Sequence, residues 1–266
     1  MCDLDPGTCA RKDFAEQERP AMRLQFLGSG DAFGSGGRFN TCMLVENEST
    51  GFLVDCGASA LIAMKRFRVA PDSIDTIFIS HLHVDHFGGL PYFILDAQFS
   101  KRSSPLTIAG PPGLNRRLKE AMDVFFPGSS EIEQKFDIRI HELEPGVKTL
   151  VNDISVTPYV VSTKHVRGSL SFALRFETEG RILAYSGDSN WCDALAQAGC
   201  EADLFVCEAY FYEKEIKYHI NLKTLEKHLE EIRPKRLILT HMSADLLARL
   251  DSIRHEIAED GKVVTF

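Results

Sequence analysis

The fold and the chemistry of this chain are decided by one short stretch, Ile79-Ser80-His81-Leu82-His83-Val84-Asp85-His86-Phe87-Gly88-Gly89-Leu90-Pro91. It follows a strand-like apolar run and carries three histidines and a carboxylate. Side chains two positions apart in extended backbone point the same way, so His81 and His83 share one direction. Imidazoles and carboxylates are ligands that suit zinc and related divalent metals. Four such groups exceed what one catalytic zinc takes from a single segment, so the stretch indicates two adjacent metals.

The alternative interpretation of this stretch is a surface turn that is rich in histidine. A lone histidine usually has no special role. The spacing H-x-H-x-D-H at the end of an apolar strand, followed by Gly88 and Gly89, is far more specific. The pattern therefore favours a metal site.

The composition is that of an ordinary globular domain, with 266 residues, 44% hydrophobic and 26% charged. No internal repeat or interior linker is present, so we expect one domain. The formal net charge of −8 disfavours general binding to nucleic acid or to a membrane surface. Seven cysteines in scattered positions fit a reduced, cytoplasmic protein better than a disulfide framework.

The first residues are polar and lack the apolar segment of a secretory signal. We expect a flexible extension over residues 1–21 and one hydrolase domain over residues 22–266, beginning at Met22. No run of about 18 apolar residues occurs, so no membrane-spanning helix is expected.

Short apolar runs alternate with Gly, Pro and Asp along the rest of the chain. Predicted strands are Leu24–Leu27, Cys42–Val45, Phe52–Val54, Thr76–Ile79, Leu106–Ala109, Ile154–Val160, Leu170–Phe176, Ile182–Tyr185, Leu204–Val206, Leu237–Leu239 and Val263–Phe266. Predicted helices are Ala58–Phe67, Gly113–Val124, Leu222–Ile232 and Ala244–Ile257, the last from a stripe of leucine and isoleucine at helical spacing. This pattern indicates an α/β or α+β fold with helices covering sheet faces.

The histidine stretch resembles the signature loop of the metallo-β-lactamase superfamily, and its Gly-Leu-Pro ending resembles the ribonuclease Z-like branch. Four further motifs of that superfamily occur in the expected order along the chain, one before the stretch at Asp55 and three after it at His165, Asp188 and His241. The resemblance spans Met22 to about Asp251. It implies a four-layer αββα sandwich, the metallo-β-lactamase fold.

The resemblance also implies a ligand set for two divalent metals, zinc in the first place with manganese or iron as alternatives. One metal would be held by His81, His83 and His165. The other would be held by Asp85, His86 and His241, with Asp188 bridging the two. Two such metals share a water and lower its pKa towards about 7, so hydroxide forms at neutral pH.

Two carboxylates have further expected roles around these metals. Asp85 would also orient the hydroxide as a catalytic residue. Asp55 would support the histidine loop from behind rather than bind metal.

A proton donor for the leaving group is expected from Glu208 and His219. In ribonuclease Z-like enzymes a glutamate orients a histidine that protonates the leaving alkoxide, and Glu208-Ala209 and His219 resemble those elements. This sequence departs from the pattern, since Tyr210 and Asn221 stand where threonines are usual. The alternative is a histidine that only precedes a helix capped by Asn221.

The glycine-rich segment Gly28–Asn40 resembles the first loop of the branch, which borders the metal site. It lacks the Gly-Lys-Ser/Thr of a phosphate-binding loop and the context of a dinucleotide fingerprint. A tight turn is the simplest interpretation, and a contact between Arg38 and substrate is a hypothesis.

The tRNA-processing members of the branch carry a long basic arm, and in bacterial forms it lies between the third-motif histidine and the bridging aspartate. The short interval from His165 to Asp188 leaves no room for it, and the acidic balance also disfavours tRNA. We therefore expect a dinuclear zinc phosphodiesterase that acts on a small anionic ester, such as a cyclic nucleotide.

Several alternatives to this function stay open. They are a lactonase or thioesterase on the same metal site, ribonuclease Z-like RNA processing, a metal-binding scaffold without catalysis, and an iron oxygenase. A homodimer also stays open, because members of the branch often form dimers.

Overall fold

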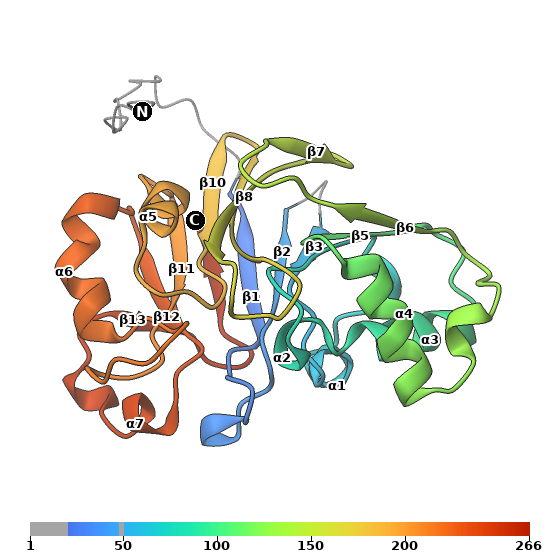
Figure 1. Ribbon diagram of the computed structural model, residues 1–266, viewed down its shortest axis with the longest axis horizontal. Helices are drawn as coiled ribbons and strands as arrows, with labels where there is room; N and C mark the ends of the chain where they lie inside the picture. The colour runs from blue at the N-terminus through green and yellow to red at the C-terminus, as the bar shows by residue number, and fades with distance from the viewer. Residues whose placement is uncertain (1–20, 48–50) are drawn as a thin grey trace.

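The apolar runs form two sheets of seven strands each in the computed structural model, which describes residues 21–47 and 51–266 (Figure 1). The first sheet has the order β14 (Val263–Thr265), β1 (Arg23–Gly28), β2 (Cys42–Glu46), β3 (Gly51–Val54), β4 (Thr76–Phe78), β5 (Leu106–Gly110) and β6 (Ile138–Glu142). The second has the order β13 (Glu256–Ile257), β12 (Leu237–Thr240), β11 (Leu204–Glu208), β10 (Arg181–Tyr185), β9 (Ser171–Thr178), β8 (Ile154–Ser162) and β7 (Thr149–Val151).

Central strands such as β5 and β11 are buried on both faces because each sheet is covered on both sides. In β1, Leu24 and Phe26 belong to the core between the sheets, whereas Leu27 packs under the helices of the first sheet. The rings of Phe78 and Phe176, one from each sheet, meet at 5.0 Å between centroids. Because side chains alternate between the two faces of each sheet, the strands contribute to three apolar layers. One layer lies between the sheets, and one lies under the helices on the outer face of each sheet.

Helices cover the outer face of each sheet (Figure 1). The first sheet packs against α1 (Ala60–Arg66), α2 (Val84–Phe87), α3 (Leu90–Phe99) and α4 (Leu114–Phe125). The second packs against α5 (Asp193–Gly199), α6 (Leu222–Ile232) and α7 (Ala244–Leu247). Short 3₁₀ turns are η1 (Ser35–Gly37), η2 (Pro71–Ser73), η3 (Ser129–Glu131) and η4 (Leu250–Ser252). The result is the expected four-layer αββα sandwich.

The predicted helix Ala244–Ile257 is wrong beyond Leu247. After α7 the chain makes the turn η4 and then forms β13, which pairs in parallel with β12. The guanidinium of Arg236 donates to both carboxylate oxygens of Glu256 at 2.8 Å, which fixes the segment at the sheet edge. The leucine and isoleucine side chains of this segment still pack against the core beside α6. Their spacing therefore predicted correctly that they are buried, but not that they form one helix.

Several elements were absent from the sequence prediction. These are α2, α3, α5, the short strands β6, β7 and β13, and the 3₁₀ turns. The predicted helix Leu222–Ile232 matches α6 at both ends, and Asn221 caps it, since its Oδ1 accepts the Thr224 amide at 2.8 Å.

Parallel pairing brings the carboxyl ends of the central strands to one edge of each sheet. Strands β3 to β6 are parallel, as are β10 to β13. The loops after β3, β4, β10, β11 and β12 carry most of the residues that the sequence singles out, and His165 joins them from the loop after β8.

The described part of the chain begins at Ala21, and Met22 is fully buried against the C-terminus, where its amide donates to the Phe266 carbonyl at 3.1 Å. The predicted extension, apart from Ala21, lies outside the described residues. Among the helices described, none has the length and apolar character needed to cross a membrane.

Candidate metal centre

The histidine stretch turns sharply between β4 and α2. His81 and His83 follow the strand, with His83 in extended backbone at the N-cap of α2, and Asp85 and His86 lie in this short helix. The turn packs on the end of β3, where a Cβ at Gly57 would clash with the backbone oxygen of Asp85. Only a glycine at this position allows so close an approach.

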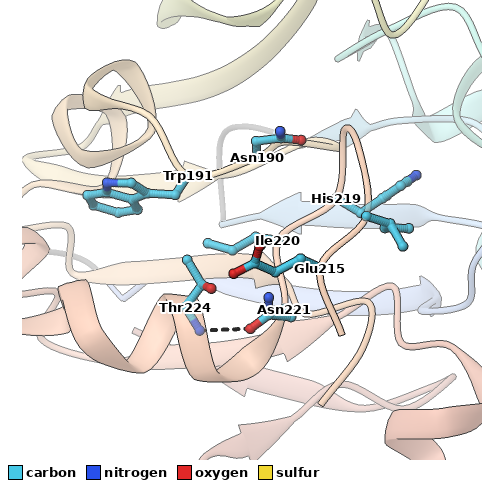
Figure 2. Close-up of a pocket in the computed structure, with 8 residues that line it drawn as sticks. Asn190, Trp191, Glu215, His219, Ile220, Asn221 and Thr224 are labelled. Atoms are coloured by element: carbon cyan, nitrogen blue, oxygen red, sulfur yellow. Dashed lines mark hydrogen bonds between the residues drawn. The ribbon is translucent and has the colours of Figure 1, made fainter. Parts of the chain in front are cut away.

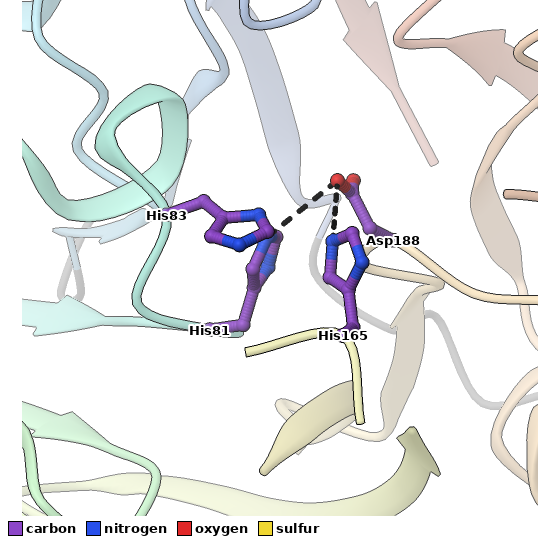
Figure 3. A group of neighbouring side chains, drawn as sticks. All are labelled: His81, His83, His165 and Asp188. Atoms are coloured by element: carbon purple, nitrogen blue, oxygen red, sulfur yellow. Dashed lines mark hydrogen bonds and ion pairs between the residues drawn. The ribbon is translucent and has the colours of Figure 1, made fainter. Parts of the chain in front are cut away.

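A first group of side chains joins this stretch to the second sheet (Figure 3). His81 and His83 meet His165, from the loop after β8, and Asp188, from the loop after β10, with ligand atoms within 4.8 Å of one another. Asp188 Oδ2 lies 3.3 Å from His165 Nε2 and 3.5 Å from His81 Nε2.

A second group lies beside the first and shares Asp188. It contains Asp85, His86 and His241, and again the ligand atoms lie within 4.8 Å of one another. His86 Nε2 is 3.3 Å and His241 Nε2 is 3.6 Å from Asp188 Oδ1. The two oxygens of one carboxylate thus face two separate groups of imidazoles.

Whether the two groups fit a metal can be judged from their buried nitrogen and oxygen atoms, several of which have no hydrogen-bond partner. His81 Nε2, His86 Nε2 and Asp188 Oδ1 are buried and form no hydrogen bond. Leaving such atoms unsatisfied costs about 1–3 kcal/mol each. A divalent cation between these donors removes that cost, so the side chains present fit a metal.

Electrostatics in the cluster favour cation binding. Burial lowers the pKa of His83 to about 4, which keeps that imidazole neutral. Burial also opposes charge on His86 and His241, but nearby carboxylates, Asp188 above all, outweigh it and raise the pKa of both imidazoles. A metal that takes these nitrogens therefore displaces protons, and its affinity falls in acid.

Asp55 lies behind the second group at the end of β3, as predicted. Its carboxylate accepts the Ser80 amide at 2.7 Å and the Ser80 hydroxyl at 2.8 Å, and it lies 2.7 Å from His86 Nδ1. Because a carboxylate only accepts, Nδ1 of His86 carries a hydrogen, and Nε2 is the nitrogen left to bind a metal.

Glu208 and His219 also meet at the centre. His219 Nδ1 lies 3.0 Å from Glu208 Oε2, and Glu208 Oε1 accepts the Ser189 amide at 2.5 Å. Burial opposes the charged imidazole, but the carboxylate outweighs it and raises the pKa of His219. The same two residues with Asp188 and His241 form a third group whose ligand atoms lie close enough to hold an ion.

A cavity of about 180 Å³ opens above these groups. Its walls contain five of the residues in the first two groups together with His219, and Ala32, Phe33 and Tyr210 complete the lining. The Tyr210 ring stacks on the His219 ring at 4.7 Å between centroids. Burial, followed by the nearby Asp31 carboxylate, raises the pKa of Tyr210 to about 12, so its hydroxyl stays protonated.

A second cavity of about 200 Å³ also has His219 in its wall (Figure 2). It is bounded by Asn190 and Trp191 after β10, by Glu215, and by the first turn of α6. His219 therefore borders two cavities.

Comparison with known proteins places this chain in a family. The model of the family described as "Anti-Pycsar protein Apyc1" matches residues 22–260, which is most of the chain. The chain belongs to the Anti-Pycsar protein Apyc1 family.

Individual relatives agree with the fold and with the class of metal-dependent hydrolases. The ribonuclease Z of Methanosarcina acetivorans is 26% identical, with 84% of this chain and 88% of that protein covered. The crystal structure of the short form of human tRNase Z (ELAC1) superposes with a TM-score of 0.72 at 26% identity, covering 91% of this chain and 98% of that one. The metallo-β-lactamase fold protein YhfI from Bacillus subtilis has a TM-score of 0.74 at 18% identity, covering 93% and 100%. The chain is thus a metal-dependent hydrolase of the metallo-β-lactamase superfamily, in its ribonuclease Z-like branch.

The glycine-rich segment borders the cavity, as its resemblance implies, but through Ala32 and Phe33 rather than Arg38. The Arg38 guanidinium donates to the Ala258 carbonyl at 2.5 Å and to the Ser29 hydroxyl at 3.2 Å. A substrate contact by Arg38 remains a hypothesis, and the position of Phe33 was missed because a single aromatic in a loop carries no spacing signal.

Proposed function

We propose that this protein is a dinuclear zinc phosphodiesterase that acts on a small phosphodiester such as a cyclic nucleotide. The observation that carries the proposal is the orientation of Asp188, whose Oδ2 faces His81 and His165 and whose Oδ1 faces His86 and His241. A carboxylate shared in this way suits two adjacent cations.

In this proposal His81, His83 and His165 hold one metal, and Asp85, His86 and His241 hold the other, with Asp188 between them. Zinc suits these donors best, and manganese or iron accept the same set. When bound, the metals would polarise the phosphoryl oxygens and activate water. Asp85 also lies at the cavity wall, where its carboxylate can orient that water.

His219 donates the proton that the leaving alkoxide needs. Glu208 takes up Nδ1 of the imidazole, which leaves Nε2 as the atom available to the substrate. The raised pKa keeps the imidazole protonated closer to neutral pH. A departing alkoxide is a strong base and needs a proton as it leaves, whereas the thiolate released from a thioester is a weaker base. The presence of a proton donor therefore favours a phosphodiester substrate over a thioester.

The size of the site favours a small substrate. The interval from His165 to Asp188 contains β9 and β10, which pair as an antiparallel hairpin and leave no inserted arm. The alignment with the archaeal relative runs over 275 positions, more than this whole chain of 266 residues, so that relative contains segments absent here. The cavity of about 180 Å³ is below the roughly 300–1,000 Å³ of sites for drug-sized ligands.

Four substrates assayed side by side on metal-loaded protein test the proposal. They are bis-p-nitrophenyl phosphate, a 3′,5′-cyclic nucleotide, a homoserine lactone and a thioester. We expect hydrolysis of the two phosphodiesters and metal analysis near two ions per chain. Turnover confined to the lactone or the thioester would instead identify the carbon–oxygen or carbon–sulfur hydrolase.

RNA cleavage is the second candidate, because relatives such as the Methanosarcina acetivorans protein are named ribonuclease Z. A precursor tRNA added to the same panel separates it from the first. We expect the small diester to be cleaved with the higher kcat/KM, since the net charge of −8 disfavours binding of a long polyanion.

A further inference from the structure

An exposed phenylalanine stands at the metal cavity and has no part in the chemistry described so far. Phe33 is 85% exposed, yet it lines the same cavity as His83, Asp85 and His241. Single exposed apolar side chains are common on protein surfaces and need no explanation. An exposed aromatic ring at the wall of a metal cavity is placed where a substrate would touch it.

The turn that carries Phe33 is firmly held. The carboxylate of Asp31, itself buried, accepts the Phe33 amide at 3.2 Å and the Ser35 amide and hydroxyl at 2.8 Å. The Asn40 side chain donates to the Asp31 carbonyl at 3.0 Å. These bonds fix the backbone, so presenting the ring to a ligand costs little ordering entropy.

The next turn along the same loop packs against α7. A Cβ at Gly36 would lie 2.9 Å from Leu247 Cδ1, and φ of +69° at Gly36 requires a glycine. The loop is therefore held by its own hydrogen bonds around Phe33 and by packing against α7 at Gly36. The Phe33 ring is therefore exposed on a loop whose backbone is held in place.

The volume of the cavity indicates which part of a substrate it can hold and which part would lie beside the Phe33 ring. About 180 Å³ bordered by His83, Asp85, His165 and His241 suits a phosphodiester group, and it is below the roughly 300–1,000 Å³ of cavities that enclose a drug-sized ligand. The remainder of such a substrate must leave the cavity along its walls. The walls outside the two metal groups are Ala32, Phe33, Tyr210 and His219, and two of these carry apolar aromatic rings.

We propose that Phe33 is the stacking platform for a flat aromatic group attached to the phosphodiester, a nucleobase in the first place. This inference deepens the proposed function and rests on it for the position of the phosphoryl group. Stacking needs no hydrogen-bond pattern, so the site selects for a base without strong preference among bases. Phe33 is then a specificity-determining residue that separates nucleotides from aliphatic phosphodiesters.

Equilibrium binding tests the inference independently of turnover. Because active enzyme would consume the diesters themselves, calorimetry on metal-loaded protein measures the Kd of their hydrolysis-resistant phosphorothioate analogues. One is the analogue of cyclic AMP, and the other is the analogue of the base-free six-membered cyclic phosphate of 1,3-propanediol. For Phe33→Ala we expect Kd for the cyclic AMP analogue to rise about tenfold, since base–aromatic stacking is worth about 1–3 kcal/mol. The Kd for the base-free ligand should stay unchanged, and Phe33→Trp should retain the wild-type preference.

Phe99→Ala is the matched control, because Phe99 is 84% exposed and does not line the cavity. It should bind both ligands as the wild type does. Equal loss of both ligands in Phe33→Ala, or no loss of either, overturns the stacking role. A change in oligomeric state of Phe33→Ala by light scattering also overturns it, since the ring would then contact a second copy.

The proposed function can fail separately from this inference. If the wild type binds the cyclic AMP analogue but hydrolyses no phosphodiester, the phosphodiesterase is refuted while the binding series still decides the role of Phe33. If the wild type hydrolyses both cyclic esters with equal kcat/KM and Phe33→Ala changes neither, the enzyme stands and the stacking role is refuted.

Discussion

The Oδ2 atom of Asp55 lies 2.7 Å from Nδ1 of His86, and both side chains are fully buried. The same carboxylate also holds the amide and hydroxyl of Ser80, directly before His81. One residue at the end of β3 therefore orients both ends of the histidine stretch. An imidazole fixed in one tautomer and one orientation is a better ligand than a free one.

Asp55→Asn should lower metal affinity about 10- to 100-fold while the fold is kept. The amide can still accept from Ser80, but it no longer stabilises the hydrogen on His86 Nδ1. Asparagine suits the backbone, because φ at Asp55 is +59° and asparagine tolerates this left-handed conformation. Titration of the apoprotein with zinc measures the change.

Asp203→Asn is the matched control for this variant. Asp203 is also a buried carboxylate that accepts a backbone amide, that of Ile182 at 2.8 Å, but it lies outside the metal groups. It should bind zinc as the wild type does. Equal affinities in Asp55→Asn and the wild type would remove Asp55 from the support of the centre.

Asp188→Ala should reduce the bound metal from near two ions per chain to less than one. Each half of the centre loses an oxygen, and the repulsion between two cations is no longer screened by a carboxylate between them. Elemental analysis of protein dialysed against trace zinc gives the ratio. An unchanged ratio with normal circular dichroism would rule out the shared position of Asp188.

Much of this centre could be predicted from the sequence because its residues lie in short motifs. His81, His83, Asp85 and His86 are close in sequence, and a local turn after one strand brings them together. The more distant residues, such as Asp188, follow strand ends whose parallel pairing the sequence does not encode locally. Their place in the site was available only through the resemblance to a family.

The strained backbone of some site residues and the positions of the loops around them could not be predicted from the sequence. His241 has φ of +56°, a conformation that costs about 1–3 kcal/mol outside glycine and persists when its surroundings enforce it. The surroundings include the Ser29 carbonyl, which accepts the His241 amide at 3.1 Å from far along the chain. Such a contact depends on the packing of two sheets. The same holds for β13, where pairing with β12 overrides a helical apolar pattern.

His219→Ala should lower kcat on the best phosphodiester about 10²- to 10⁴-fold, which is the usual contribution of a general acid. Bound metal should stay near the wild-type ratio, because the other two groups keep all their ligands. Steady-state kinetics and elemental analysis on the same preparation give both quantities. Loss of metal together with activity would assign His219 to the third group as a ligand instead.

His141→Ala provides the control for the loss of an imidazole. His141 is exposed on β6 and belongs to none of the three groups. It should leave both kcat and metal content unchanged. A fall in kcat with this variant would mean that the assay responds to changes in the protein unrelated to proton donation.

Glu208→Gln should move the alkaline limb of the kcat–pH profile to lower pH. The Glu208 carboxylate raises the pKa of His219 against the opposing effect of burial, so the protonated donor persists to higher pH in the wild type. The neutral amide removes that charge, the pKa falls, and the donor loses its proton at lower pH. Glu226→Gln changes a comparable pair, since Glu226 Oε1 lies 3.3 Å from His255 Nε2 away from the centre, and it should leave the profile unmoved. If the limb of Glu208→Gln coincides with that of Glu226→Gln, another group donates the proton.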